Sequence, residues 1–221
     1  MKKILAIIFI VLPIRIFCQL FDGGVQVGLT GSQIDGDALG GYKKIFFSPF
    51  VYSQLNLNKI SILSGVGYIM KGAREMKSPI FHDVTLHYAE IPLLFTFKMF
   101  KNDTIFNFFD KVDFTVGLLY GYLIDGNINN SGAIVNIFQT DIRKSDFYYW
   151  LSINYKLSSK LKIQFVYNYS LFTVNKEPFS LKIYSNMLNR AIYNIYTPWL
   201  WWNRTIRLNF QIKLFSTKKQ K

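Results

Sequence analysis

The feature that most constrains the fold is a strict two-residue alternation of apolar and polar side chains near the end of the chain. In the segment TIRLNFQIKLF, residues 205–215, apolar residues occupy every second position from Ile206 to Leu214, and polar or charged residues lie between them. Because successive side chains of a β-strand point to opposite faces, this segment predicts a strand with one apolar face and one polar face. The apolar face then meets either a protein core or lipid.

The same alternation returns seven more times along the chain, and no helical periodicity of similar quality competes with it. An even number of strands can close into an antiparallel up-and-down barrel that leaves no strand edge exposed. The eight expected strands cover residues 24–32, 45–57, 59–71, 84–98, 112–124, 146–157, 160–172 and 204–215.

The lengths of the strands and of their connections favour lipid as the surroundings of the apolar faces. Most of these runs are longer than soluble strands, which average about 5–6 residues, and match the ~9–11 residues of a tilted transmembrane strand. Alternation of short and long connections is typical of outer-membrane barrels. Short turns are expected at 56–58 and 158–159, and long loops at 33–44, 72–83, 125–145 and 173–203. The connection at 99–111 is an exception, because it is long although it lies at the same end of the barrel as the short turns. The predicted fold is therefore an all-β, eight-stranded antiparallel transmembrane barrel over residues 19–215.

The two ends of the chain carry their own signals. Two lysines, an apolar run over residues 4–12 and a short tail predict a secretory signal peptide at 1–18, cleaved after Cys18. Acylation of Cys18 is the alternative. Since Cys18 is the only cysteine, a disulfide scaffold is excluded for the mature chain. Residues 216–221 form a basic C-terminal tail.

The chain is basic, with a formal net charge of +13. In an exported protein whose lysines are spread singly along strands, this charge favours outer-membrane lipid and lipopolysaccharide as partners and argues against nucleic acid. Cell-envelope proteins are the second class of partner that we consider. The expected location is the outer membrane.

The interior of an eight-stranded barrel is just wide enough for its own side chains. Charged residues on the inward faces must then pair with one another, so we expect a packed ionic network and a closed lumen. The candidates for this network are Glu90, Lys98, Asp113, Lys162, Arg207 and Lys213.

A resemblance to a known family rests on three segments: GGVQVGLTGSQIDGDALGGYKK (23–44), YIMKGARE (68–75) and LHYAEIPLLFTF (86–97). They resemble the first half of the PorT-like outer-membrane β-barrel proteins of Bacteroidota, a porin-like family. The resemblance implies an outer-membrane location, and one branch of that family assists protein secretion and gliding. The residues that match its motifs are Lys71, Gly72, Tyr88, Glu90, Ile91 and Pro92.

Few residues in the sequence suggest a catalytic site or a surface that contacts a partner. His82 and His87 are the only histidines, and one histidine pair near an acid is weak support for a lipid-modifying enzyme. We therefore expect no catalytic, metal or cofactor site. Trp199, Trp201 and Trp202 lie in the last long loop, where they form either a contact surface for a partner or an interfacial belt.

The predicted function is that of a non-enzymatic barrel with a closed lumen, which anchors or displays loops, or docks a partner. Three alternatives remain open. The first is an accessory factor for protein secretion or gliding, the second is a lipid-modifying barrel enzyme, and the third is a soluble, lipocalin-like barrel with its apolar faces turned inward.

Overall fold

The structure is a computed structural model, and it describes most of the chain after the expected signal peptide. The predicted signal peptide and the last four residues of the predicted tail lie outside the described residues. The described ranges are 21–36, 41–57, 59–75, 82–98, 111–130, 133–140, 142–176, 179–184, 191–197 and 200–217.

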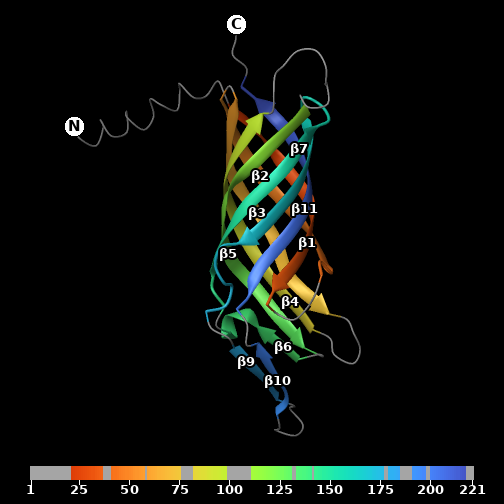
Figure 1. Ribbon diagram of the computed structural model, residues 1–221, viewed down its shortest axis with the longest axis vertical. Coiled ribbons are helices and arrows are strands. Elements are labelled where there is room, and N and C mark those ends of the chain that lie inside the picture. Colours follow the sequence, from red (N-terminus) through yellow and green to blue (C-terminus); the bar gives the residue numbers. More distant parts are fainter. Residues whose placement is uncertain are drawn as a thin grey trace, which may run out of the picture.

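Eight long strands form a closed antiparallel barrel, which confirms the predicted fold class (Figure 1). Each strand pairs with its neighbours in the chain, and the last strand returns to pair with the first. The pairing of β4 with β5 completes the ring, so every barrel strand has a partner on both sides. The barrel strands are β1 (Phe21–Asp35), β2 (Lys44–Asn56), β3 (Ile60–Glu75), β4 (His82–Lys98), β5 (Val112–Asn130), β7 (Ser145–Lys156), β8 (Leu161–Ser170) and β11 (Trp202–Ser216).

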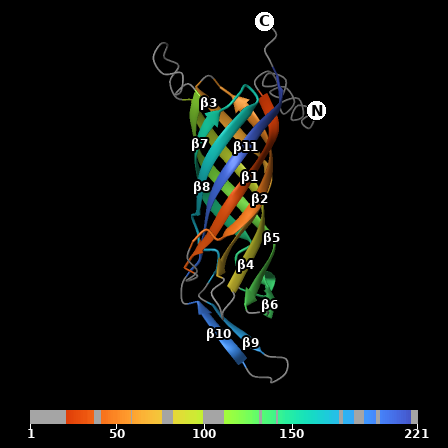
Figure 2. The ribbon, with the colours of Figure 1, turned by 90° about the vertical axis from the view of Figure 1, so that its right-hand side faces the viewer.

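The two ends of the barrel differ. Asp22 pairs with Ser216 at one end, where short turns join β2 to β3 and β7 to β8; we call this the short-turn end. Asp35 pairs with Trp202 at the opposite, long-loop end. Figure 2 shows that, among the described residues, the short strands outside the barrel wall lie beyond the long-loop end.

The strands continue into segments that the sequence analysis expected to be loop. β3 extends to Glu75 and β5 to Asn130, because their backbone ladders with β4 continue where the apolar side chains no longer face outward. No helix in the described part of the chain is long and apolar enough to cross a membrane. The additional elements of the two longest loops are β6 (Ala133–Asn136), a 3₁₀ helix η2 (Ile137–Gln139), and the hairpin of β9 (Phe179–Tyr184) and β10 (Ala191–Thr197).

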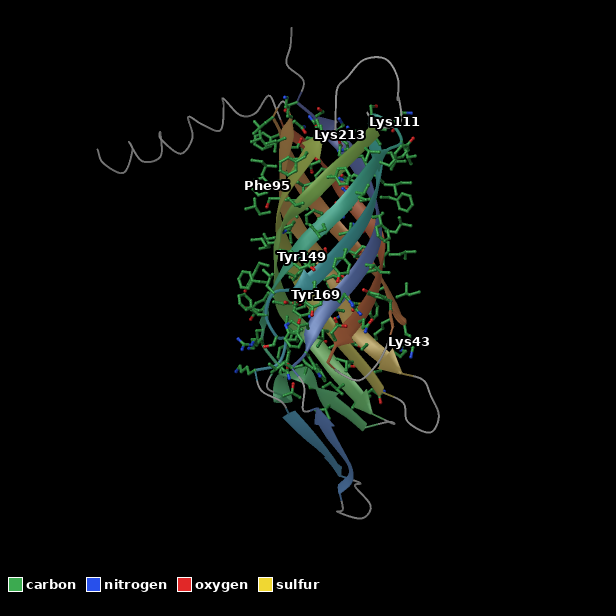
Figure 3. The ribbon with its side chains drawn as sticks, in the orientation of Figure 1. Lys43, Phe95, Lys111, Tyr149, Tyr169 and Lys213 are labelled. Carbon is green, nitrogen blue, oxygen red and sulfur yellow. The ribbon has the colours of Figure 1, made fainter. Side chains whose placement is uncertain are left out.

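Along most of the barrel the apolar side chains point outward and the polar ones inward, as Figure 3 shows for the side chains around the wall. On β11, Leu208 and Phe210 are exposed, whereas Arg207 and Asn209 are buried. The exposed apolar side chains come from all eight barrel strands and include Leu29, Phe47, Val51, Val66, Ile91, Leu93, Val116, Leu118, Leu151, Ile153, Phe165, Leu208 and Leu214.

This pattern inverts at the long-loop end. On β1, Leu29 points outward and is 57% exposed, whereas Ile34 points inward and is fully buried. On β5, the outward positions change from Leu118 to Asn127, while Ile128 is buried. An apolar cluster therefore fills the interior of the barrel at the long-loop end, and residues of the connecting segments cover it. Its members are Ile34, Ile69, Ala73, Val84, Leu86, Tyr88, Leu123, Ile128, Ile137, Ile142, Val174 and Trp201.

Candidate functional site

Four ionisable side chains meet inside the barrel: Lys71, Glu90, Asp146 and Arg207, which we call the central charged cluster. Arg207 donates two hydrogen bonds of 2.9 Å to Glu90, so the guanidinium and the carboxylate form a bidentate pair. The Lys71 ammonium lies 3.2 Å from Asp146 Oδ2 and 3.9 Å from Glu90 Oε1. All four side chains are buried, and their two positive and two negative charges compensate one another.

Neutral hydrogen-bond donors also contact the two carboxylates, although Asp146 Oδ1 is buried without a hydrogen-bond partner among the described residues. The Tyr148 hydroxyl donates to Glu90. The Asn203 amide and the Ser170 hydroxyl donate to Asp146 Oδ2 over 2.9 Å and 3.0 Å. Because a buried ion pair is favourable only when its remaining polar atoms are also bonded, these donors offset the cost of removing the charges from water.

Aromatic rings cover the two cations of the cluster. The Lys71 Nζ atom lies 3.4 Å from the centroid of the Tyr148 ring and 4.7 Å from that of Tyr88. The Arg207 guanidinium lies 5.2 Å from the Trp150 ring centroid. Ring faces carry a partial negative charge, so they stabilise cations that water does not reach.

The residues that match the family motif divide between the two faces of the wall. Lys71, Tyr88 and Glu90 point inward and meet in or against the central charged cluster. Ile91 points outward and is 52% exposed, and Pro92 is buried beside the cluster. The motif therefore brings β3 and β4 side chains together at the centre of the interior.

Gly72, the remaining motif residue, has a backbone conformation that favours glycine. Its φ is +152°, and a Cβ atom at this position would lie 1.9 Å from the carbonyl oxygen of Val84 on the paired strand. Its amide donates to the Ser32 hydroxyl over 2.8 Å. A side chain here would force β3 away from β4 just above Lys71.

Three further ion pairs lie at the short-turn end. Asp113 lies 2.8 Å from the Lys156 ammonium and 3.6 Å from that of Lys162. Lys213 lies 3.5 Å from Asp22. Three of the expected network residues (Asp113, Lys162 and Lys213) are thus placed in pairs of their own, separate from Glu90 and Arg207.

Lys98 departs from its expected place within the packed lumen. It is the last residue of β4, in register with Asp113 of β5, and its side chain is exposed at the rim. The alternation predicts an inward direction for Lys98, but the strand ends at this residue, at the rim of the barrel.

Sequence reasoning missed several partners. Asp146 was not among the residues expected in the ionic network, although the outward position of Phe147 predicts an inward direction for it. The ion pairs that Asp83 forms with Lys44 and, over 2.7 Å, with Arg74 at the long-loop end were also missed. Their strand positions lie where the expected strands had already given way to loop, so alternation carried no signal for them.

The histidines are not arranged with a nucleophile in the described structure. His87 points outward, and its Nδ1 lies 2.5 Å from the Tyr68 hydroxyl. His82 begins β4, and its side chain lies outside the described residues. Asp83, the acid nearest to both in sequence, is held by Lys44. Among the described residues, no three His, Cys, Asp or Glu side chains are grouped so that they could hold a metal ion.

The three tryptophans of the last loop differ in position. Trp199 lies outside the described residues. Trp201 is 3% exposed and packs in the apolar cluster at the long-loop end, and its amide donates to Asn175 over 2.7 Å. Neither expected role of Trp201, in a contact surface or in an interfacial belt, fits this position, because its buried side chain closes the barrel. Trp202 is half-buried at the start of β11.

The packing of side chains leaves little room for ions or solutes to pass through the lumen of the barrel. A cavity of about 10 Å³ lies beside the central charged cluster, lined by residues that include Gln26, Ser48 and Trp150. Such a volume holds about one water molecule. The central charged cluster fills the middle of the barrel, and the apolar cluster fills its interior at the long-loop end.

We expect the barrel reconstituted in a planar lipid bilayer to show no stable conductance steps, because both clusters block a continuous water path. Single-channel recording at high salt measures this directly. A porin of about 16 strands, which encloses an aqueous channel, serves as the positive control. Reproducible steps that grow with salt concentration would contradict a closed lumen.

The fold is similar to that of solved barrels, while sequence comparison gives no relatives. No protein-family model and no curated protein sequence matches the chain. The crystal structure of Neisserial surface protein A matches with a TM-score of 0.50 and 12% identity, covering 88% of this chain and 97% of that chain. Ail, the attachment invasion locus protein of Yersinia pestis, solved with the heparin analogue sucrose octasulfate, matches with a TM-score of 0.46 and 11% identity, covering 88% of this chain and 99% of that one. The chain is thus similar in fold to an eight-stranded outer-membrane barrel protein.

Proposed function

We propose that this protein is an integral outer-membrane β-barrel without enzymatic activity, whose closed lumen serves as a rigid anchor for the loops at its long-loop end. Those loops display a surface or dock a cell-envelope partner. The observation that carries the proposal is the inversion of side-chain polarity along the barrel wall.

The inversion supports a membrane boundary on the barrel wall. A protein in water turns apolar side chains inward along its whole length, whereas lipid requires them outside. Here Leu29 is exposed and Thr30 buried in the main part of β1, but beyond them Ile34 is buried and Asp35 partly exposed. A change of solvent from lipid to water along the same strand explains both patterns.

The direction of insertion follows from the connections. Outer-membrane barrels have short periplasmic turns and longer extracellular loops, so the short-turn end faces the periplasm. The expected signal peptide at 1–18 supports export to that membrane. The partners that we propose are outer-membrane lipid and lipopolysaccharide around the wall, and cell-envelope proteins at the loops.

The interior supports this function over a lipocalin-like one. A soluble ligand carrier needs a cavity of about 300–1,000 Å³, whereas the space beside Glu90 and Arg207 is about 10 Å³. The resemblance to PorT-like proteins stays a prediction, and a role in secretion or gliding rests on that resemblance alone.

We expect a heat-dependent shift in gel mobility when the outer-membrane fraction is run in SDS with and without boiling. A closed barrel with all strand edges paired resists SDS until it is heated. The same fraction should stay in the membrane pellet after a carbonate wash. Recovery of the protein from the soluble periplasm, with one mobility before and after boiling, would show that the apolar wall does not face lipid.

A further inference from the structure

Three tyrosines form an aromatic surface on the outside of the barrel. Tyr149 of β7 lies between Tyr167 and Tyr169 of β8, with ring centroids 6.1 Å and 6.2 Å away, and the Tyr149 and Tyr169 rings are stacked (Figure 3). We call them the tyrosine cluster. Their rings are half-buried and their outward faces lie at the surface.

Hydrogen-bonding groups border this cluster on the next two strands. Arg204 of β11 is in register with Tyr169, and its guanidinium lies 2.9 Å from Gln33 Oε1 and 3.1 Å from Asp35 Oδ1. The Tyr42 ring lies 5.3 Å from the same guanidinium. Donors and acceptors therefore stand beside flat aromatic faces, and the charge of Arg204 is already balanced by Asp35.

An apolar groove begins at the cluster and continues toward the short-turn end. It has a volume of about 250 Å³ and lies across β5, β7 and β8, with Tyr167 as the member that it shares with the tyrosine cluster. Its other lining residues are Phe114, Thr115, Val116, Leu151, Ser152, Ile153 and Phe165. In a lipid-facing wall, a groove of this composition accommodates an acyl chain.

The cluster also lies at the level where the wall changes polarity. On β11 the outward position changes from Ile206 to Arg204, and on β1 from Leu29 to Gln33. Tyrosine is enriched at such membrane–water interfaces, where lipid headgroups begin. With the long-loop end outside, the headgroups at this level belong to the outer leaflet.

We propose that this surface is a binding site for one outer-leaflet glycolipid of the lipid A type, a proposal that rests on the outer-membrane location proposed above. A sugar ring of the headgroup stacks on the tyrosine cluster, and its hydroxyls bond Gln33, Asp35 and Arg204. One acyl chain occupies the groove. Because the Arg204–Asp35 pair is balanced and carries no net positive charge, the contacts assigned to it are hydrogen bonds to sugar hydroxyls and not to the phosphates of lipid A.

The test measures which lipids stay bound to the full-length barrel. Detergent-solubilised barrel is mixed with purified lipid A, or with phosphatidylglycerol of matched acyl length, and the bound lipid is counted by native mass spectrometry. The triple variant Tyr149→Leu, Tyr167→Leu, Tyr169→Leu keeps the wall apolar but removes the rings. The matched control is Tyr120→Leu with Tyr122→Leu, which removes two outward tyrosines of β5 that lie outside the cluster.

We expect wild type and control to retain one lipid A per barrel, and the triple variant to bind it about tenfold more weakly, a loss of about 1.4 kcal/mol. Equal retention of lipid A by wild type and triple variant, or equal binding of both lipids to wild type, would overturn the proposal.

The heat-dependent gel shift of each sample separates this proposal from the proposed function. Barrels that shift on boiling but bind no lipid A are folded membrane barrels without this site, and only the glycolipid proposal then fails. Wild-type protein that is soluble and shows no shift removes the outer-membrane function itself, and the glycolipid site with it.

Discussion

Replacing Glu90 by Gln should destabilise the folded barrel by about 3–5 kcal/mol, the range for removing one partner of a buried ion pair. The substitution preserves the size of the side chain but leaves Arg207 and Lys71 with only Asp146 to balance their charge. Urea unfolding in lipid vesicles, followed by tryptophan fluorescence, measures the free energy of unfolding. Trp150 lies over Arg207 and reports on this part of the interior.

Two further variants test whether the cost of Glu90→Gln comes from the burial of its ion pair or follows from the loss of any ion pair. Lys213→Gln removes one partner of the ion pair with Asp22, whose side chains are 30% and 15% exposed, and should cost about 0–1 kcal/mol. Glu90→Gln combined with Arg207→Met should recover most of the stability, because no uncompensated charge remains inside. A cost of Glu90→Gln no larger than that of Lys213→Gln would show that the central charged cluster does not stabilise the barrel.

The double variant also tests why the cluster is ionic at all. If Glu90 and Arg207 can be replaced together with little loss, the pair contributes to fixing the register of β11 within the barrel more than to net stability. These two residues are 117 positions apart and face each other across the interior. A misregistered β11 would place a different side chain opposite Glu90 and leave it unpaired.

The contact between Glu90 and Arg207, two residues that are far apart in the chain, could not be predicted from the sequence. Alternation gave the fold class and assigned Glu90 and Arg207 to the inward face, since the direction of a side chain depends only on its parity within a strand. It could not show that these two residues meet, because that depends on strand register and tilt around the closed ring. Asp146, which completes the cluster with Lys71, was within reach of the same parity argument, because the outward position of Phe147 turns Asp146 inward.

The long-loop end was predicted less well than the rest. Residues 125–130 were expected to be loop because the alternating run ends at Ile124, and Trp201 was expected in a contact surface or an interfacial belt. Along most of the wall the apolar side chains do face outward. Beyond the proposed membrane boundary the opposite holds: Ile128 and Trp201 are buried in the cluster that closes the barrel. Alternation carries no signal for this part of β5, because Ile128 is the single large apolar residue of 125–130 and a register shift opposite His87 and Tyr88 changes which residues face outward.

Leu208→Arg should cost about 2–4 kcal/mol in the unfolding free energy measured in vesicles, since that is the cost of a cationic side chain on the lipid face near the bilayer midplane. Leu208 is outward, 43% exposed, and in register with Leu29 and Phe165, which are also exposed. Leu214→Arg, on the same strand and face but close to the short-turn end, should cost about 0–1 kcal/mol. The two variants add the same charge and volume and differ in depth alone.

This difference in depth separates lipid from water as the solvent of the wall. In water, Leu208 and Leu214 are both exposed surface positions, so both substitutions should change stability by about 0.5 kcal/mol or less. In a bilayer, Leu208 lies about midway between Arg204, where the outward face turns polar, and the short-turn rim. A cost that is large at Leu208 and small at Leu214 therefore supports a membrane-embedded belt between these limits. Equal and small costs at both positions would mean that the outward apolar side chains contact something other than lipid.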